Sequence, residues 1–305
     1  RWIRGGYIDE RHTFNVFAYG RGNYSYISPP REFQQIGTSF AKIIVAHDSF
    51  IKTLEAENIK EIPAQPNLKQ VARFEFFNQS KDKQSGVWLV RQGNLSFALP
   101  ITTGTKPAIA DYLAAPFGLK GFAAPVEEIY PSLVPFLELE DGKTYAASEG
   151  ANLIEPSKDG QSLRVVWNKW AQIGTKSGER FDIGLTSEIV WKIVGNKLIR
   201  TETLTANKDL TIKNWRVAVP TTADKTRIET NETRRTDVFE GREGMMKVSA
   251  RADWKYDVSL FAAGDGKLSK GVLRAIPLHL IYSAENLQLK KGKKSSWELS
   301  LELLK

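Results

Sequence analysis

The side chains most suited to chemistry gather near the start of the chain, between Tyr7 and Tyr26. Four of the nine tyrosines fall in these twenty residues. Within them, residues 19–24 (YGRGNY) set glycines between functional side chains. Glycine leaves room for a bulky ligand, arginine offers a planar fork to a carboxylate, and tyrosine can exchange a proton or stack on a sugar. This segment is therefore our candidate site.

Eliminating a group beside a uronate carboxylate needs these residue types. Donors must neutralise the carboxylate, a base must remove the neighbouring proton, and an acid must protonate the leaving oxygen. We assign catalysis to Tyr19, Tyr24 and His12, and substrate binding to Arg21, Asn23, Asn15 and Tyr26. The alternative is that these side chains only pack and cap a loop, because clustered polar groups favour a site without defining one.

The number and spacing of cysteines and histidines do not predict a metal site. The chain has no cysteine and three histidines, and no two histidines have metal-ligand spacing. His47 falls on the apolar stripe of a predicted helix and is expected in a core, and His279 is expected in a strand. We therefore predict no metal and no cofactor.

Composition narrows the class of partner. The 305 residues are 41% hydrophobic and 26% charged, which is a globular balance. The net charge of +8 attracts anionic polymers. Basic residues are not interleaved with aromatic ones as in nucleic-acid modules, and no apolar run is long enough for a transmembrane helix. We expect an acidic polysaccharide or oligosaccharide as partner, with no nucleic acid and no membrane.

The segment before residue 62 predicts one long helix. Ser28 can cap it, and Pro29 suits the first turn. Apolar side chains then recur every three or four residues to Leu54, which predicts a helix of about 25 residues. We expect it to be the last member of a helical array, and we assign residues 1–62 to the end of a helical domain.

The segment from 63 to 305 predicts an antiparallel β-sandwich domain. Alternating residues at 187–194 and 197–204, joined by Gly195 and Asn196, predict a hairpin. Further strands are predicted at 71–76, 87–90, 163–170, 211–219, 247–254 and 297–303. Many strands without alternating helices indicate two broad stacked sheets rather than a βαβ fold. The fold class is thus mainly β, a large two-sheet sandwich preceded by a long helix.

Two further patterns in the β region have competing interpretations. Trp167 and Trp170 could line a sugar groove, but their spacing puts them on opposite faces of a regular strand, so one should be buried. The basic run 290–294 (KKGKK) predicts a solvated turn before the last strand.

The chain opens on Arg1 and Trp2 as if in the middle of a pattern. Either a signal peptide has been removed, as is routine for secreted chains, or the chain is the C-terminal piece of a longer protein. We favour the second, with a missing N-terminal helical domain, and expect a periplasmic or secreted location.

These features together resemble polysaccharide lyases built from an (α/α) toroid and a β-super-sandwich, such as those of heparinase II/III and alginate-lyase architecture. The parts that carry the resemblance are residues 15–26, the helix from Pro29, and the hairpin from Gly86 to Pro100. The resemblance implies a site in the cleft between toroid and sandwich, with tyrosine as base and arginine or asparagine as carboxylate neutraliser. Most of the toroid is missing here, and no complete catalytic set can be matched.

Three functions follow from these patterns. The first is the C-terminal portion of a polysaccharide lyase, or of a glycoside hydrolase of similar shape, acting on acidic polysaccharide. The second is a non-catalytic carbohydrate-binding or structural sandwich. The third and weakest is a mutarotase-like epimerase, for which His279 would be the strand histidine.

Overall fold

The computed structural model describes most of the predicted β region and little of what precedes it. The described residues are 48–49, 51–53, 55–57, 70–78, 85–102, 116, 118–122, 133–147, 150–173, 179–221, 223, 225–231, 234–241, 244–262 and 278–304. Residues 48–49, 51–53 and 55–56 are helical, and the Glu57 N–H that follows them donates to the Thr53 carbonyl at 2.9 Å. The remainder of the helix predicted from Pro29, including His47, lies outside the described residues. No helix in the described part is long and apolar enough to cross a membrane.

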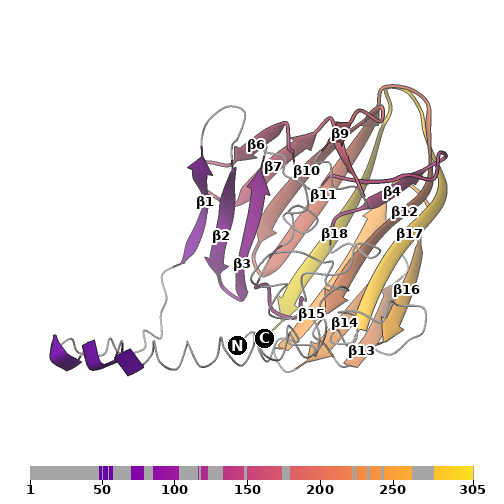
Figure 1. Ribbon diagram of the computed structural model, residues 1–305. Helices are drawn as coiled ribbons and strands as arrows, with labels where there is room; N and C mark the ends of the chain where they lie inside the picture. The colour runs from indigo at the N-terminus through magenta and orange to yellow at the C-terminus, as the bar shows by residue number, and fades with distance from the viewer. Residues whose placement is uncertain are drawn as a thin grey trace, which may run out of the picture.

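Antiparallel strands build three sheets in the described part (Figure 1). The smallest contains β1 (Val71–Asn78), β2 (Ser85–Gln92) and β3 (Leu95–Thr102). The order in the eight-stranded sheet is β13 (Lys225–Asn231), β14 (Arg234–Gly241), β15 (Gly244–Ala252), β18 (Lys294–Leu304), β11 (Lys197–Ala206), β10 (Leu185–Val194), β7 (Ser162–Trp167) and β6 (Leu153–Pro156). The order in the seven-stranded sheet is β16 (Asp257–Ala262), β17 (Leu278–Leu289), β12 (Leu210–Thr221), β4 (Phe136–Leu139), β5 (Thr144–Ala146), β8 (Trp170–Gln172) and β9 (Arg180–Phe181). The predicted mainly β, antiparallel sandwich is confirmed.

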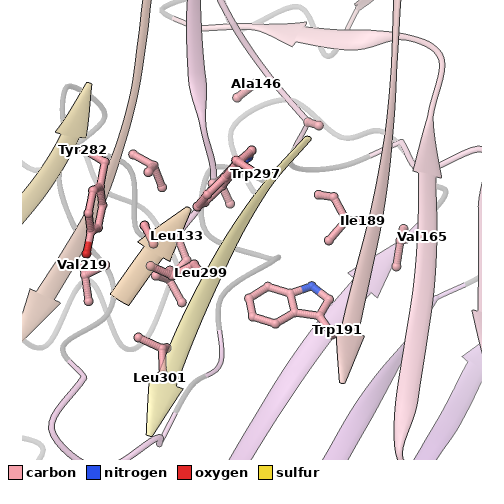
Figure 2. Packing of buried hydrophobic residues seen from close by; sticks show 14 of the residues in the cluster. Leu133, Ala146, Val165, Ile189, Trp191, Val219, Tyr282, Trp297, Leu299 and Leu301 are labelled. Atoms are coloured by element: carbon pink, nitrogen blue, oxygen red, sulfur yellow. The ribbon is translucent and has the colours of Figure 1, made fainter. Parts of the chain in front are cut away.

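The two large sheets form the sandwich because their strands alternate buried and open positions. Every second residue of β11, from Leu198 to Ala206, is buried, and β10 and β18 continue this face. Figure 2 shows Tyr282 and Val219 of the seven-stranded sheet across the core from Leu299 and Leu301 of the eight-stranded sheet. A period of two with one apolar side is the pattern of a sheet with one face packed on a core.

Tryptophans fill much of this core. Six of them are almost fully buried: Trp88, Trp167, Trp170, Trp191, Trp215 and Trp297. The Trp215 ring of β12 meets the Trp297 ring of β18 edge-on, with centroids 5.3 Å apart. This contact ties the two large sheets together at the centre of the core, and such edge-to-face pairs add stability beyond their buried area.

The three-stranded sheet is an addition to the predicted two-sheet arrangement. Its buried Trp88 donates a hydrogen bond from Nε1 to the Gly160 carbonyl at 2.8 Å. Gly160 has a positive φ of 70°, and a Cβ placed there would overlap the backbone of Ala72 in β1. The small sheet therefore packs directly against the turn between β6 and β7, at a position that requires glycine.

Two turns cross between the large sheets side by side at one end of the sandwich (Figure 1). The first, residues 207–209, joins β11 to β12, and the second, residues 290–293, joins β17 to β18. The Gly292 N–H donates to the Ala206 carbonyl at 2.8 Å, so the second turn is hydrogen-bonded to the end of β11, directly before the first turn.

Candidate functional site

The candidate site predicted from the sequence lies outside the described residues. This holds for every assigned position: His12, Asn15, Tyr19, Arg21, Asn23, Tyr24 and Tyr26. Their roles therefore remain predictions.

His279 is a strand residue, as predicted. It lies in β17, where its backbone is opposite Pro220 of β12 and Phe261 of β16. The side chain of His279 is outside the described part of the structure. The mutarotase-like alternative, which needs a carboxylate beside this histidine, remains a prediction.

Trp167 and Trp170 were expected on opposite faces of one strand with one of them buried, and in the structure both side chains are fully buried. The chain leaves the strand between them, so Trp167 ends β7 in one large sheet and Trp170 begins β8 in the other. Trp170 donates from Nε1 to the Leu185 carbonyl at 2.7 Å. The rule that residues three apart face opposite sides holds only within one regular strand. Neither ring is open to a sugar.

An ionic group that the sequence analysis missed sits inside the sandwich. Arg200 and Glu202 are each 1% exposed and lie on the inward face of β11. Glu202 accepts hydrogen bonds from Arg200 Nη1 at 3.0 Å, from Trp297 Nε1 at 2.7 Å, and from the Ser187 hydroxyl. The carboxylate is thus held by three donors. We call these four residues the buried ionic cluster.

Aromatic rings flank the cation of this cluster. Arg200 is opposite Trp191 of β10, and its guanidinium carbon lies 5.6 Å from the centroid of that ring. The same carbon is 4.9 Å from the centroid of Trp297. Cation–π attraction is strongest where water is absent, so both indoles compensate Arg200 for part of its lost hydration.

The electrostatics of the buried ionic cluster indicate a structural role in the core rather than a catalytic one. Burial lowers the pKa of Arg200, while the neighbouring Glu202 carboxylate acts in the opposite direction. An arginine stays protonated at neutral pH even so. No face of either side chain reaches solvent. The signal for this cluster was present in the sequence, because Arg200 and Glu202 occupy positions where the alternation of β11 calls for apolar residues.

A second polar group lies on the same inward face, in β14. Arg235 binds Asp237 through Nε at 3.0 Å and through Nη2 at 2.7 Å. Its hydrogen bonds to Asp237 raise the pKa of Arg235. The Arg235 side chain is 33% exposed, whereas Asp237 is buried. Because the buried carboxylate already neutralises this guanidinium, the pair is a poor receptor for a sugar carboxylate.

Charged side chains on the outward face of the eight-stranded sheet are paired across strands. Arg164 of β7 contacts Glu155 of β6 at 2.5 Å and Glu188 of β10 at 2.8 Å. Arg251 of β15 contacts Glu298 of β18 at 3.0 Å. Acid–base catalysis by two carboxylates needs them to face one substrate, and these are engaged by guanidinium groups instead. This face therefore offers a solvated surface rather than an active site.

Metal ligands do not gather in the described part of the chain. No three or more histidine, aspartate or glutamate side chains lie together there in a way that could hold a metal ion. With all positions of the predicted site outside the described residues, the prediction of no metal stays untested.

No protein-family model matches the chain, and no curated protein matches it. Several solved structures are similar at low identity, and three of them are heparinases or heparan sulfate lyases. A structure titled as a heparinase III gene product is 12% identical, with a TM-score of 0.38 over 90% of this chain and 42% of its own. Another heparinase III is 8% identical, with a TM-score of 0.44 over 78% and 38%. The heparan sulfate lyase HepC from Pedobacter heparinus is 9% identical, with a TM-score of 0.38 over 87% and 40%. The chain spans about two fifths of the length of these proteins.

Proposed function

We propose that this chain is part of a carbohydrate-active protein whose chemistry resides in residues 12–26 and acts on an acidic polysaccharide. The observation that carries the proposal is the run of tyrosine, arginine and asparagine at 19–24, set between glycines and followed by a broad antiparallel sandwich. The net charge of +8 supports an anionic substrate, since a cationic protein concentrates polyanions at its surface.

The proposed reaction is elimination at a uronate. Arg21 and Asn23 neutralise the sugar carboxylate, which makes the neighbouring C–H more acidic. Tyr19 or Tyr24 removes that proton, and the other tyrosine or His12 protonates the leaving oxygen. Asn15 and Tyr26 contact the sugar beside the reacting unit. A new double bond forms in the uronate as the glycosidic C–O bond breaks, and no water is consumed.

Hydrolysis by the same segment is less favoured than elimination. Retaining and inverting hydrolases place two carboxylates on either side of the scissile bond. Asp9 and Glu10 are adjacent in sequence, so in an extended segment they point apart. The outward carboxylates Glu155, Glu188 and Glu298 are held by arginines.

The test is turnover of acidic polymers. The protein is incubated with alginate, heparin-type and pectin-type polysaccharides while the ultraviolet absorbance of unsaturated uronate is followed. We expect a signal with at least one polymer. At least one of Tyr19→Phe and Tyr24→Phe should lower kcat by about 10²-fold or more, as loss of a general acid or base does. Tyr256→Phe, which removes a hydroxyl bonded to the Ala250 carbonyl, is the matched control and should leave kcat unchanged.

Absence of signal from a folded protein with every polymer would remove the elimination proposal. The non-catalytic module would then be the better account, particularly if glycan binding survived Tyr19→Phe, Tyr24→Phe and Arg21→Ala. New reducing ends without unsaturated products would instead identify hydrolysis.

A further inference from the structure

The two crossing turns at the end of the sandwich carry a concentration of lysines. The exposed lysines are Lys208 in the first turn, and Lys290, Lys291, Lys293 and Lys294 in and beside the second. The Gly292 N–H bonds to Ala206 at the end of β11, and the Lys291 N–H bonds to Asp209 of the first turn, so these five lysines share one end of the molecule. We call this surface the lysine end.

The lysine end is held in place by one carboxylate. Asp209 accepts the backbone N–H of Lys291 at 2.8 Å and contacts Lys290 Nζ at 3.2 Å. The Lys293 N–H donates to the Lys290 carbonyl at 3.0 Å, which closes the turn. Hydrogen bonds from Lys291 and Lys290 lower the pKa of Asp209, so it is ionised at neutral pH. The turn is therefore fixed by its backbone, and its other lysine side chains are left for solvent.

A third segment packs against the same end. The Asn207 N–H donates to the Gly184 carbonyl at 3.0 Å, and the stem of Lys208 passes over Gly184. Asp182 is the acidic residue of this segment, and one of its oxygens accepts the Gly184 N–H at 2.8 Å. The segment therefore supports Lys208 and leaves most of the positive charge of the lysine end uncompensated.

The lysine end differs from the strand faces in its charge pairing. On the outward face of the eight-stranded sheet, Arg164, Lys197, Lys247 and Arg251 each contact a carboxylate. In the described part of the chain, Lys208, Lys291 and Lys293 form no ion pair. Lys294 is attracted to Glu188 and lowers the pKa of that carboxyl after the larger effect of Arg164. The charge of Lys291 also lowers the pKa of Asp209, which is the one carboxylate within the two turns and stands against five lysines.

We propose that the lysine end binds acidic polysaccharide as a second contact, separate in sequence from the proposed site at residues 12–26. This inference rests on the proposed function for the class of polymer. A polyanion with a charge on successive sugars can meet several lysines at once, so individually weak exposed contacts add through multivalency. Retention of the polymer at this end would raise its concentration near the protein and lower KM.

The chemistry of the turns favours a polysaccharide over nucleic acid. Residues 182–184, 207–209 and 290–294 contain no aromatic side chain. Proteins that bind single-stranded nucleic acid combine cations with aromatic rings on which the bases stack. A sulfated or carboxylated glycan needs only the cations.

The test compares two variants with the same loss of charge. The first is K208Q/K291Q/K293Q, which keeps Lys290 and its bond to Asp209. The matched control is K158Q/K225Q/K255Q, which removes three exposed lysines from other parts of the described surface. Binding of heparin and of alginate is measured by calorimetry at about 0.1 M salt, where charges beyond about 10 Å are screened. Neutral dextran serves as the blank.

We expect the lysine-end variant to bind at least one acidic polymer about tenfold more weakly, and the control to change by less than about twofold. Equal losses in both variants would overturn the inference, because net charge alone would then explain binding. Tighter binding of a DNA duplex or a single strand than of either glycan would also overturn it.

The same proteins separate this inference from the proposed function. If the wild type cleaves a polymer and the lysine-end variant is unaffected in binding and KM, the lysine end has no such role while the proposed function stands. If the lysine-end variant loses binding and no polymer is cleaved, the second contact stands and the catalytic proposal fails. If the wild type binds neither polymer, the inference fails.

Discussion

Replacing Glu202 by glutamine should be among the most costly single changes in the sandwich. The substitution keeps the volume but removes the charge that compensates Arg200, which is 1% exposed. Breaking a buried ion pair by removing one partner costs about 3–5 kcal/mol, because the other charge is left without compensation. Full burial means that solvent cannot screen the loss. Glutamine also replaces one acceptor oxygen by an NH₂ group, so one of the three donors to Glu202 would face another donor.

The assay is urea unfolding followed by tryptophan fluorescence, with the midpoint and slope compared between variants. We expect Glu202→Gln to lower the free energy of unfolding by about 4 kcal/mol. Glu298→Gln makes the same chemical change on the outward face of β18, where Glu298 pairs with the exposed Arg251. That control should cost less than about 1 kcal/mol.

A double substitution isolates the cause. Arg200→Met in the Glu202→Gln background removes the orphaned cation, so the double variant should be more stable than the sum of the single effects by about 2 kcal/mol or more. Additive costs would refute the reasoning, as would a Glu202→Gln variant no less stable than Glu298→Gln.

Two further substitutions probe other parts of the fold. Gly160→Ala should lower the free energy of unfolding several times more than Gly142→Ala, since both glycines have positive φ but only at Gly160 would the new Cβ overlap the Ala72 backbone. Unfolding midpoints and hydrogen exchange in β1–β3 measure the difference, and equal losses in the two variants would contradict the clash. Arg164→Gln should return the pKa of Glu188 upward, because the Arg164 hydrogen bond is the main cause of its lowering. Because the pKa of Glu188 is lower in the folded protein, its contribution to the free energy of unfolding is present above the unfolded value of about 4.3. This contribution is lost as the pH falls through the folded pKa, so the variant should lose less stability on acidification than the wild type. For this half-exposed pair the effect should stay under about 1 kcal/mol, and an NMR titration of Glu188 without an upward shift would contradict it.

Local alternation was enough to predict the strands that have regular periods. The hairpin of β10 and β11 follows from its alternating residues and its Gly195 turn, and the structure pairs Val194 with Lys197 as the turn requires. Alternation cannot say which strand lies beside which when they are distant in the chain. For that reason alternation does not predict the separate three-stranded sheet, and it predicts one strand over residues 163–170 although the chain changes sheets at Asn168 and Lys169.

The candidate site shows the same limit in a stronger form. Residue type and spacing identified a tyrosine–arginine–asparagine segment, but its positions lie outside the described residues. The basic run at 290–294 was correctly predicted as an exposed turn. Its fixed shape could not be predicted, because the carboxylate that holds it, Asp209, is about eighty residues away in sequence. The buried ionic cluster was missed because a hydrophobic pattern records where polar residues interrupt it but not which partners compensate them.

The position of β18 has a consequence for how the protein is made. This strand, Lys294–Leu304, comes last among the described strands yet lies between β15 and β11 near the middle of the eight-stranded sheet. During synthesis, the facing edges of those two neighbours stay unpaired until β18 has left the ribosome. Open strand edges of this kind recruit other chains, and slow long-range pairing prolongs the exposure. Aggregation during expression should therefore depend on how quickly residues 294–304 follow β15 and β11 out of the ribosome.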